Sequence, residues 1–217
     1  MDRPVDHYWD IKLSSLKENL EKNNFEVFVA GSLKEVRSIV METLLPRIKP
    51  ASISWGGSMT FVASGLYNEL KESQSMTVLD TFDKDLSAEE SMERRRQSLM
   101  VDLYITGTNA VTENGMLVNL DMIGNRIAAL TFGPKEVIII IGRNKIVPDL
   151  EQAMDRVKEL AAPANAMRLD KETPCVKTAS CHECKSPDRI CNTWTITQKS
   201  FPKGRVKIIL ANVDAGL

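Results

Sequence analysis

Residues able to bind a small ligand are concentrated between Thr106 and Arg126, directly after an apolar stretch at Val101–Ile105. Glycines, hydroxyls and asparagines alternate there with apolar residues. This is the arrangement expected where a loop at the end of a buried strand forms a binding site. Gly107 allows a tight exit from the strand. An ordinary connection needs about 4–6 residues, so a polar segment several times longer predicts a site.

The polar side chains of this segment have complementary chemistry. Thr108, Asn109 and Asn119 can donate and accept hydrogen bonds. Glu113 is the carboxylate that we take as the candidate catalytic acid or base. The alternative for Glu113 is that it only flanks the hairpin turn predicted by Asn114-Gly115.

A second ligand-binding loop follows the apolar stretch Ala51–Trp55. Its glycines let the backbone approach a ligand, and the amides that open the next helix favour a carboxylate or phosphate. A plain strand–turn–helix connection with a serine cap is the alternative. Back in the first segment, Arg126 adds a fixed positive charge suited to the same anion. The predicted substrate-binding residues are Gly56, Gly57, Ser58, Thr60, Thr108, Asn109, Asn119, Asn125 and Arg126.

Four cysteines form a separate candidate metal site at Cys175, Cys181, Cys184 and Cys191. Four thiolates in so short a stretch can reach one tetrahedral centre. Zn²⁺ and an iron–sulfur cluster are the two candidates, although the spacing matches neither common ferredoxin pattern. Reduced or reversibly oxidised thiols without a metal are the alternative. His182 lies within the C-x2-C pair and could replace one thiolate as a ligand.

Composition and missing motifs exclude several classes of function. The net charge of −1 gives no general attraction to nucleic acid or to anionic membranes, and Arg94–Arg96 predict only a solvated face. The longest apolar run, Val137–Ile141, is far shorter than the ~20 residues of a membrane helix. The polar N-terminus carries no apolar signal sequence, so a cytoplasmic location is expected. The sequence has no serine–histidine triad, dinucleotide-binding fingerprint or P-loop.

Alternating strands and helices must position these residues. Strands are expected near residues 25–30, 51–55, 76–79, 101–105, 136–141, 194–198 and 205–210. Helices are expected near 9–20, 32–44, 62–70, 87–99 and 148–161, with Pro46 and Pro50 ending the second. Glu136–Ile141 is apolar on both faces, which is typical of a central parallel strand. The pattern predicts an α/β fold whose central, mostly parallel sheet is flanked by helices.

We expect one domain over residues 1–217. It contains a Cys-rich loop at 162–192 and two terminal strands within 193–217, both added to the central sheet.

Three stretches of the sequence together resemble the lactate-utilisation (LUD) domain family: GTNAVTENGMLVN at 107–119, GNR at 124–126 and FGPKEVIIIIGRNK at 132–145. That family is similar in fold to the ribose-5-phosphate isomerase, glucosamine-phosphate deaminase and CoA-transferase group. The resemblance implies a strand-end pocket lined by the binding residues named above and Glu113. Asn109 stands where sugar-phosphate isomerases of the group usually carry an acid, which argues against an isomerase mechanism.

The resemblance further implies a role in the oxidation of lactate to pyruvate, within a multi-protein iron–sulfur system. The leading interpretation is a LUD-type protein that binds a small anionic metabolite in lactate or related organic-acid utilisation. One alternative is a transferase or isomerase acting on a CoA thioester or a sugar phosphate. Another is a non-catalytic redox subunit that binds zinc or an iron–sulfur cluster. Other lactate-utilisation subunits, or a second copy in a homodimer, are the expected protein partners.

Overall fold

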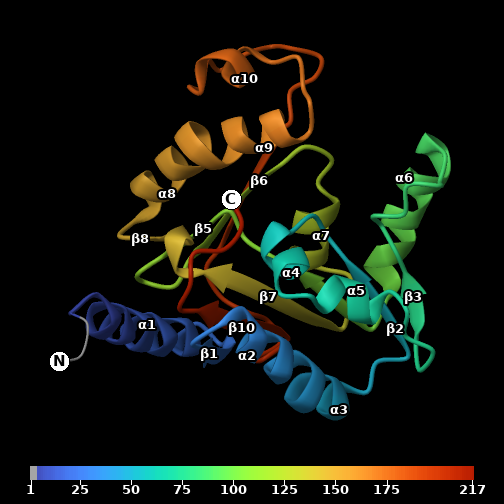
Figure 1. Ribbon diagram of the computed structural model, residues 1–217, viewed down its shortest axis with the longest axis vertical. Helices are drawn as coiled ribbons and strands as arrows, with labels where there is room; N and C mark the ends of the chain where they lie inside the picture. The colour runs from blue at the N-terminus through green and yellow to red at the C-terminus, as the bar shows by residue number, and fades with distance from the viewer. Residues whose placement is uncertain (1–3) are drawn as a thin grey trace.

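The larger of two β-sheets forms the centre of the computed structural model, which describes residues 4–217 (Figure 1). Its six strands are all parallel, in the order β1-β10-β7-β4-β2-β3. They are β1 (Glu26–Ala30), β2 (Ser52–Trp55), β3 (Thr77–Leu79), β4 (Leu103–Thr106), β7 (Glu136–Gly142) and β10 (Val206–Ala211). Because all six strands run in one direction, the loops that follow them meet at one edge of the sheet.

Helices cover both faces of this sheet and bury it. In β7, Ile139 and Ile141 pack into one hydrophobic cluster, while Ile138 and Ile140 pack into the other on the opposite face. The first cluster includes α1 (Pro4–Lys22) and α7 (Asn125–Thr131). The second includes α2 (Leu33–Ser38), α3 (Leu45–Ile48), α4 (Met59–Ala63) and α5 (Leu66–Leu70). The prediction of a central parallel strand, and of an α/β fold flanked by helices, is confirmed.

A smaller sheet lies beside the strand-end edge of the first. Its strands run in the order β8-β5-β6-β9 and are β5 (Ala110–Thr112), β6 (Leu117–Asp121), β8 (Ile146–Val147) and β9 (Thr193–Thr197). β5 and β6 form the antiparallel hairpin that the Asn114-Gly115 turn predicts. α8 (Leu150–Arg156) packs Ala153 onto this sheet, with Val157 just beyond it.

The two terminal strands differ from expectation in one respect. β10 joins the central sheet, whereas β9 pairs antiparallel with β6 in the smaller sheet. Strand periodicity predicts that a strand forms but not which partner it pairs with. The β5–β6 hairpin offers β9 a free edge next to the Cys-rich segment from which β9 emerges.

Two helix boundaries also differ from the sequence prediction. Pro46 does not end the second helix, because a π-helical turn at Ile39–Leu44 leads into α3 and places the proline in its first turn, where a missing amide is tolerated. The chain leaves the helix at Lys49, whose φ is 50°. The helix after Pro148 continues through a π-helical turn at Val157–Ala161 into α9 (Ala162–Arg168), so the first residues of the predicted Cys-rich loop are helical.

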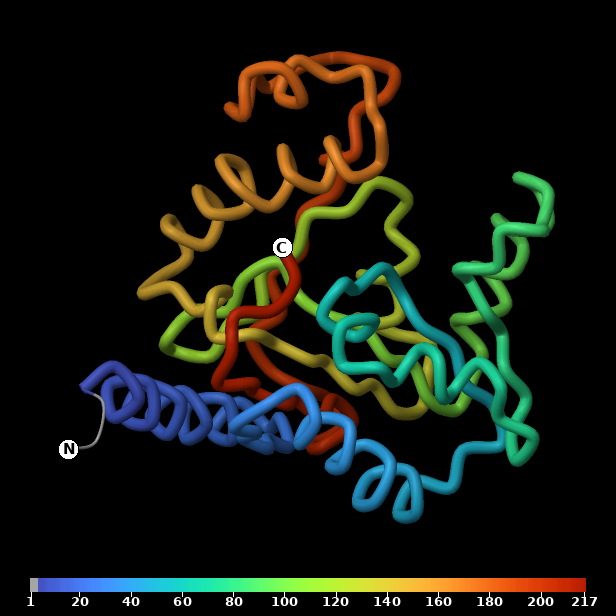
Figure 2. The backbone as a smooth tube through the Cα atoms, in the orientation of Figure 1, coloured from blue at the N-terminus to red at the C-terminus, as the bar shows by residue number. Residues whose placement is uncertain are grey.

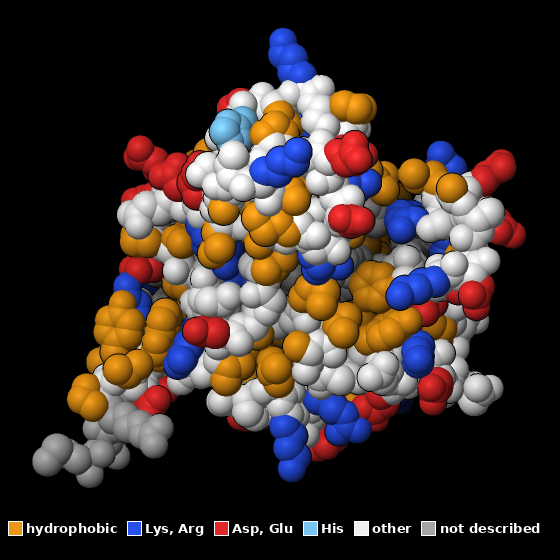
Figure 3. All heavy atoms as spheres, turned by 45° about the horizontal axis from the view of Figure 1, so that its top comes forward, with side chains coloured by type: hydrophobic (Ala, Val, Ile, Leu, Met, Phe, Trp, Pro, Cys, Tyr) orange, Lys and Arg blue, Asp and Glu red, His pale blue; other side chains and the backbone are white. Residues whose placement is uncertain are grey.

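The remaining helices lie at the periphery. α6 (Ala88–Gln97) begins with the capping box of Ser87 and Glu90 that the sequence predicts, and α10 (Pro174–Thr178) lies above α9 at the top of Figure 1. Over residues 4–217, no helix is both long and apolar enough to cross a bilayer. The face seen in Figure 3 intersperses charges of both signs with hydrophobic side chains.

Candidate functional site

Four segments meet where the central strands end. They follow β2, β4, β7 and β10, and the last of them is the C-terminal segment Asn212–Gly216 (Figure 2). A Cβ atom added to Gly107 would lie 2.8 Å from Ser58 Oγ, so the β2 and β4 loops are in close contact. The Thr60 hydroxyl donates to the Ala215 carbonyl at 3.0 Å. The structure therefore brings the two predicted loops together and adds two further segments to the site.

Arg126 organises this edge of the sheet. Its guanidinium has five N–H donors, and the structure supplies five acceptor contacts. Nε donates to Asp121 at 2.9 Å, and Nη1 donates to the Gly107 carbonyl at 3.2 Å and to Asn119 Oδ1 at 3.0 Å. Nη2 donates to Asn109 Oδ1 at 2.6 Å and also contacts Asp121. With its donors occupied by the protein, Arg126 holds the site together and has no free donor for an anion.

The charge of Arg126 is also balanced inside the protein. Its side chain and that of Asp121 are each only 9% exposed, and Asp121 additionally accepts from the backbone amide of Ile127 at 3.3 Å. Removing one partner of such a buried pair leaves the other charge uncompensated. Asp121 is therefore a second carboxylate of the segment 106–126, with a structural task that sequence reasoning missed.

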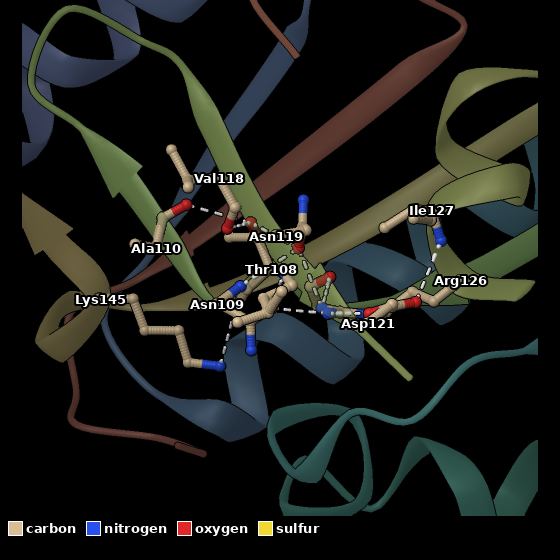
Figure 4. Close-up of polar contacts among 11 residues, drawn as sticks. Thr108, Asn109, Ala110, Val118, Asn119, Asp121, Arg126, Ile127 and Lys145 are labelled. Carbon is tan, nitrogen blue, oxygen red and sulfur yellow. Dashed lines mark hydrogen bonds and ion pairs between the residues drawn. The ribbon is translucent and has the colours of Figure 1, made fainter. Parts of the chain in front are cut away.

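The amide side chains predicted to bind substrate instead shape the loop that follows β4. Asn109 Oδ1 accepts from the backbone amide of Leu120 at 3.0 Å as well as from Arg126. Asn119 Oδ1 accepts from the Thr108 hydroxyl at 3.1 Å and from the backbone amide of Asn109 at 3.3 Å. The side-chain nitrogen of Asn119, Nδ2, is buried and has no hydrogen-bond partner among the described residues. Figure 4 shows these groups between Lys145 on one side and the Arg126–Asp121 pair on the other.

Lys145 is a site residue that sequence reasoning missed. It lies directly before β8, in the loop after β7, and is only 4% exposed. Its ammonium group donates to the Thr108 carbonyl at 3.2 Å. Burial, together with the positive charges of Arg156 and Arg126, lowers the pKa of Lys145 from 10.5 to about 7.

Arg156, on α8, approaches the same loop. Its Nη1 donates to the Asn109 carbonyl at 2.6 Å, and its Nε donates to the Asn144 carbonyl at 3.0 Å. Its Nη2 is buried and has no hydrogen-bond partner in the part of the chain that the structure describes, and desolvation lowers the pKa of the guanidinium. Within residues 4–217, neither Arg156 nor Lys145 forms a salt bridge with a carboxylate. Two cations thus contact the adjacent carbonyls of Thr108 and Asn109 without a compensating negative charge.

Two buried hydroxyls lie at the end of β4, on the side of the β2 loop. Among the described residues, the Tyr104 hydroxyl and Thr106 Oγ1 have no hydrogen-bond partner, although the Asn125 amide lies beside the tyrosine. Desolvation raises the pKa of Tyr104. A Cβ atom at Gly56 would lie 2.6 Å from the tyrosine hydroxyl and 3.1 Å from Thr106 Oγ1. Only glycine therefore fits against these two hydroxyls.

The polar side chains of the β2 loop make structural contacts, and their anion binding stays a prediction. Ser58 caps α4 by accepting from the Phe61 amide at 3.2 Å, as the alternative interpretation has it, and α4 is only five residues long. The Thr60 hydroxyl donates to the C-terminal segment. Gly57 is exposed, with open space around the position of a Cβ.

The C-terminal segment covers the cationic end of the site. Arg143 binds it through the Asp214 carboxylate at 2.9 Å and the Val213 carbonyl at 3.1 Å. The Asn144 side chain binds the Ala215 amide at 3.0 Å and the Gly216 carbonyl at 3.1 Å. A Cβ at Gly216, whose φ is 70°, would lie 2.4 Å from Thr60 Oγ1 and 3.1 Å from Lys145 Nζ. Only glycine fits where this segment passes over the lysine.

The structure does not bring Glu113 to this site. It lies at the β5–β6 turn, where its carboxylate pairs with Lys12 of α1 and its carbonyl accepts from Asn19 at 2.9 Å. The Glu113 side chain is 40% exposed, and its hydrogen bond raises the pKa of Lys12. This position matches the alternative in which Glu113 flanks the hairpin turn. Its acid–base role stays a prediction that no contact here supports.

The four cysteines lie apart from the strand-end site, in and after α10. All four are free thiols of intermediate exposure. Within residues 4–217, no three His, Cys, Asp or Glu side chains are grouped so that they could hold a metal ion. The loop is organised instead by Arg189, which donates to the Cys191 carbonyl at 2.9 Å and to the Cys184 carbonyl at 2.7 Å. The metal site at the four cysteines stays a prediction, and no step of the chemistry is derived through it.

Comparison with known proteins decides the family. A family model described as the LUD domain matches residues 13–211. The chain belongs to the LUD domain family. This confirms the resemblance carried by the 107–119, 124–126 and 132–145 stretches. No curated protein sequence matches the chain.

One solved structure is similar in fold over nearly the whole chain. A DUF162 family protein from Deinococcus radiodurans is similar with a TM-score of 0.52 and 14% identity, over 94% of this chain and 98% of that one. At this identity the likeness concerns the fold and not the reaction. A ribose 5-phosphate isomerase from Plasmodium falciparum matches with a TM-score of 0.31 and 16% identity, over 53% and 54% of the two chains.

Proposed function

We propose that this LUD protein binds a small organic anion at the strand-end site and acts in lactate or related organic-acid utilisation. The observation that carries the proposal is the pair of cations on adjacent carbonyls, Lys145 on Thr108 and Arg156 on Asn109. Arg156 Nη2 is buried without an acceptor. A buried, unpaired cationic donor is costly, and a carboxylate placed against it would supply both the missing hydrogen bond and the missing charge.

The proposed site differs from the predicted one, because another residue provides the positive charge for the anion. Arg126 is occupied by Asp121, Asn109, Asn119 and the Gly107 carbonyl. Arg156 therefore takes the anion-binding role that the sequence assigned to Arg126. The two unpaired hydroxyls of Tyr104 and Thr106 add neutral donors at the β4 end, suited to a hydroxyl or carbonyl oxygen of the ligand.

Calorimetric titration with L-lactate, pyruvate and inorganic phosphate tests the proposal. A lost hydrogen bond to a charged group is worth about 1.5–3 kcal/mol, so Arg156→Gln is expected to weaken carboxylate binding by roughly tenfold or more. Lys135→Gln is the matched control, because Lys135 is 80% exposed and pairs with Asp102 at 2.8 Å, before β4 begins. Equal affinity in wild type and Arg156→Gln, or no binding of any of the three anions, would refute the site.

A further inference from the structure

Lys145 has the surroundings of a reactive amine. Its Nζ is buried and has no carboxylate partner among residues 4–217, and the neighbouring charges that act on it, those of Arg156 and Arg126, are positive. The nearest acid of the site, Asp121, is paired with Arg126. A lysine desolvated beside another cation loses its proton more readily, and the neutral amine is a nucleophile. The lowered pKa of Lys145, about 7, agrees with this arrangement.

The two cationic side chains bind the same short piece of backbone. Lys145 and Arg156 hydrogen-bond to carbonyls of consecutive residues, Thr108 and Asn109. Both head groups therefore contact one short piece of backbone, and the charge of Arg156 acts on the amine. A 2-oxo acid carries the two groups that this pair would take: a carboxylate for Arg156 and, next to it, a carbonyl carbon for the amine.

We propose that Lys145 forms an imine with a 2-oxo acid whose carboxylate is bound by Arg156. This inference rests on the proposed function and names the substrate class of the same site. It also assigns different tasks to the two cations: Arg156 holds and orients the substrate, and Lys145 reacts with it.

The step balances without any further reactant. The lone pair of the neutral amine attacks the 2-oxo carbon, a C–N bond forms, and the electron pair of the C=O bond moves to oxygen. A proton passes from nitrogen to that oxygen to give a carbinolamine. The carbinolamine then loses water as its C–O bond breaks, leaving the imine. The adjacent cation favours the step by keeping the amine neutral and by binding the carboxylate.

The C-terminal segment lies against the amine. Gly216 passes so close to Lys145 that an added Cβ would lie 3.1 Å from Nζ. Side chains of Thr60, Arg143 and Asn144 hold the segment there. The segment therefore forms one wall of the space around the nucleophile.

Reductive trapping tests the proposal. The full chain is incubated with pyruvate and sodium cyanoborohydride, and the site of any reduced adduct is mapped by peptide mass spectrometry. One adduct on the peptide containing Lys145 is expected, and its absence in Lys145→Arg. Lys207 is an internal control, because it is equally buried at 4% exposure but is paired with Glu136 and Glu26. Adducts spread over exposed lysines, or located on Lys207, would overturn the assignment.

Two further measurements separate this inference from the proposed function. Arg156→Gln is expected to reduce trapping with pyruvate about tenfold or more, and to reduce trapping with acetaldehyde by less, because acetaldehyde has no carboxylate and is affected only through the protonation of the amine. L-lactate, which has no carbonyl group, is expected to compete with pyruvate without forming an adduct. If lactate and pyruvate bind in an Arg156-dependent way but no adduct forms, the imine is refuted and the anion site stands. If Lys145→Arg still binds lactate, its loss of trapping is not a folding defect.

Discussion

Replacing Lys145 by methionine is expected to stabilise the protein at neutral pH. The ammonium group is 4% exposed and has no carboxylate partner within the described residues, so folding must either bury a charge or release a proton. Methionine has a similar length and no charge. Lys207→Met is the contrasting variant: it removes a lysine of equal burial and deprives Glu136 of its partner, while Glu26 keeps its ion pair with Arg47. It is expected to destabilise the protein.

The magnitude follows from the pKa of Lys145, which burial and two nearby arginines lower from 10.5 to about 7. Between these two pH values the unfolded chain binds more protons than the folded one, so this group makes the folded state more stable as pH rises. Below pH 7 both states are protonated and the contribution is constant. The stabilisation by Lys145→Met is therefore largest at and below pH 7, on the order of 4 kcal/mol, and falls by about 1 kcal/mol per pH unit to roughly 1 kcal/mol at pH 10.

Urea unfolding of wild type and Lys145→Met at pH 7, 8, 9 and 10 measures this difference. Other groups that titrate in this range are common to both proteins and cancel in the comparison, including Tyr104, whose pKa is raised by burial. The titration is performed without added carboxylates, since a bound anion would favour the charged amine. A constant offset between the two proteins from pH 7 to pH 10 would refute the reasoning, because it would mean that the lysine titrates alike in both states.

Three other predictions concern residues singled out from the sequence. Arg126→Gln is expected to lower the free energy of unfolding by about 3 kcal/mol or more, because it leaves the buried Asp121 carboxylate unpaired; a loss below about 1 kcal/mol in urea unfolding would argue against the organising role of Arg126. Glu113→Gln is expected to cost less than about 1 kcal/mol and to leave pyruvate affinity unchanged in calorimetry, since its ion pair with Lys12 is partly exposed; loss of pyruvate binding would return Glu113 to the site. If the cysteines hold zinc or an iron–sulfur cluster, elemental analysis of anaerobically purified protein finds stoichiometric metal that Cys181→Ser removes, and metal-free wild type would contradict the spacing argument.

Much of the fold could be predicted because local patterns determine it. Ile138–Ile141 are all apolar, as is typical of a strand that is buried on both faces. The Asn114-Gly115 turn specifies its hairpin through local backbone preferences alone. The pairing partner of β9 could not be predicted, because alternation of side chains says nothing about which edge a strand joins.

The position of the candidate site in the fold could be predicted from the sequence, but the residues that supply its free positive charge could not. Loops after parallel strands meet at one edge, and the sequence identified two of them. Whether the Arg126 guanidinium is free to bind a ligand depends on its contacts with Asp121, Asn109 and Asn119. Those contacts form only in the folded protein, and no periodic pattern of the sequence indicates them. Arg156 has the sequence context of a solvated helix position. Lys145 ends the short helical turn that follows β7, and a lysine within the loop after a buried strand is the signal that could have identified it.

The two cationic residues of the site belong to parts of the fold that differ in how much apolar surface they bury. Lys145 follows β7, which is anchored in the two large hydrophobic clusters, whereas Arg156 belongs to α8, whose cluster around the small sheet has only five buried members: Ala110, Val118, Leu120, Ala153 and Val157. Regions with few buried apolar contacts open by local unfolding at a lower free energy than the whole domain does. The other face of the small sheet packs Val111 and Leu117 into the first large cluster. The α8 side is therefore expected to open first, and that opening would carry the arginine away from the lysine.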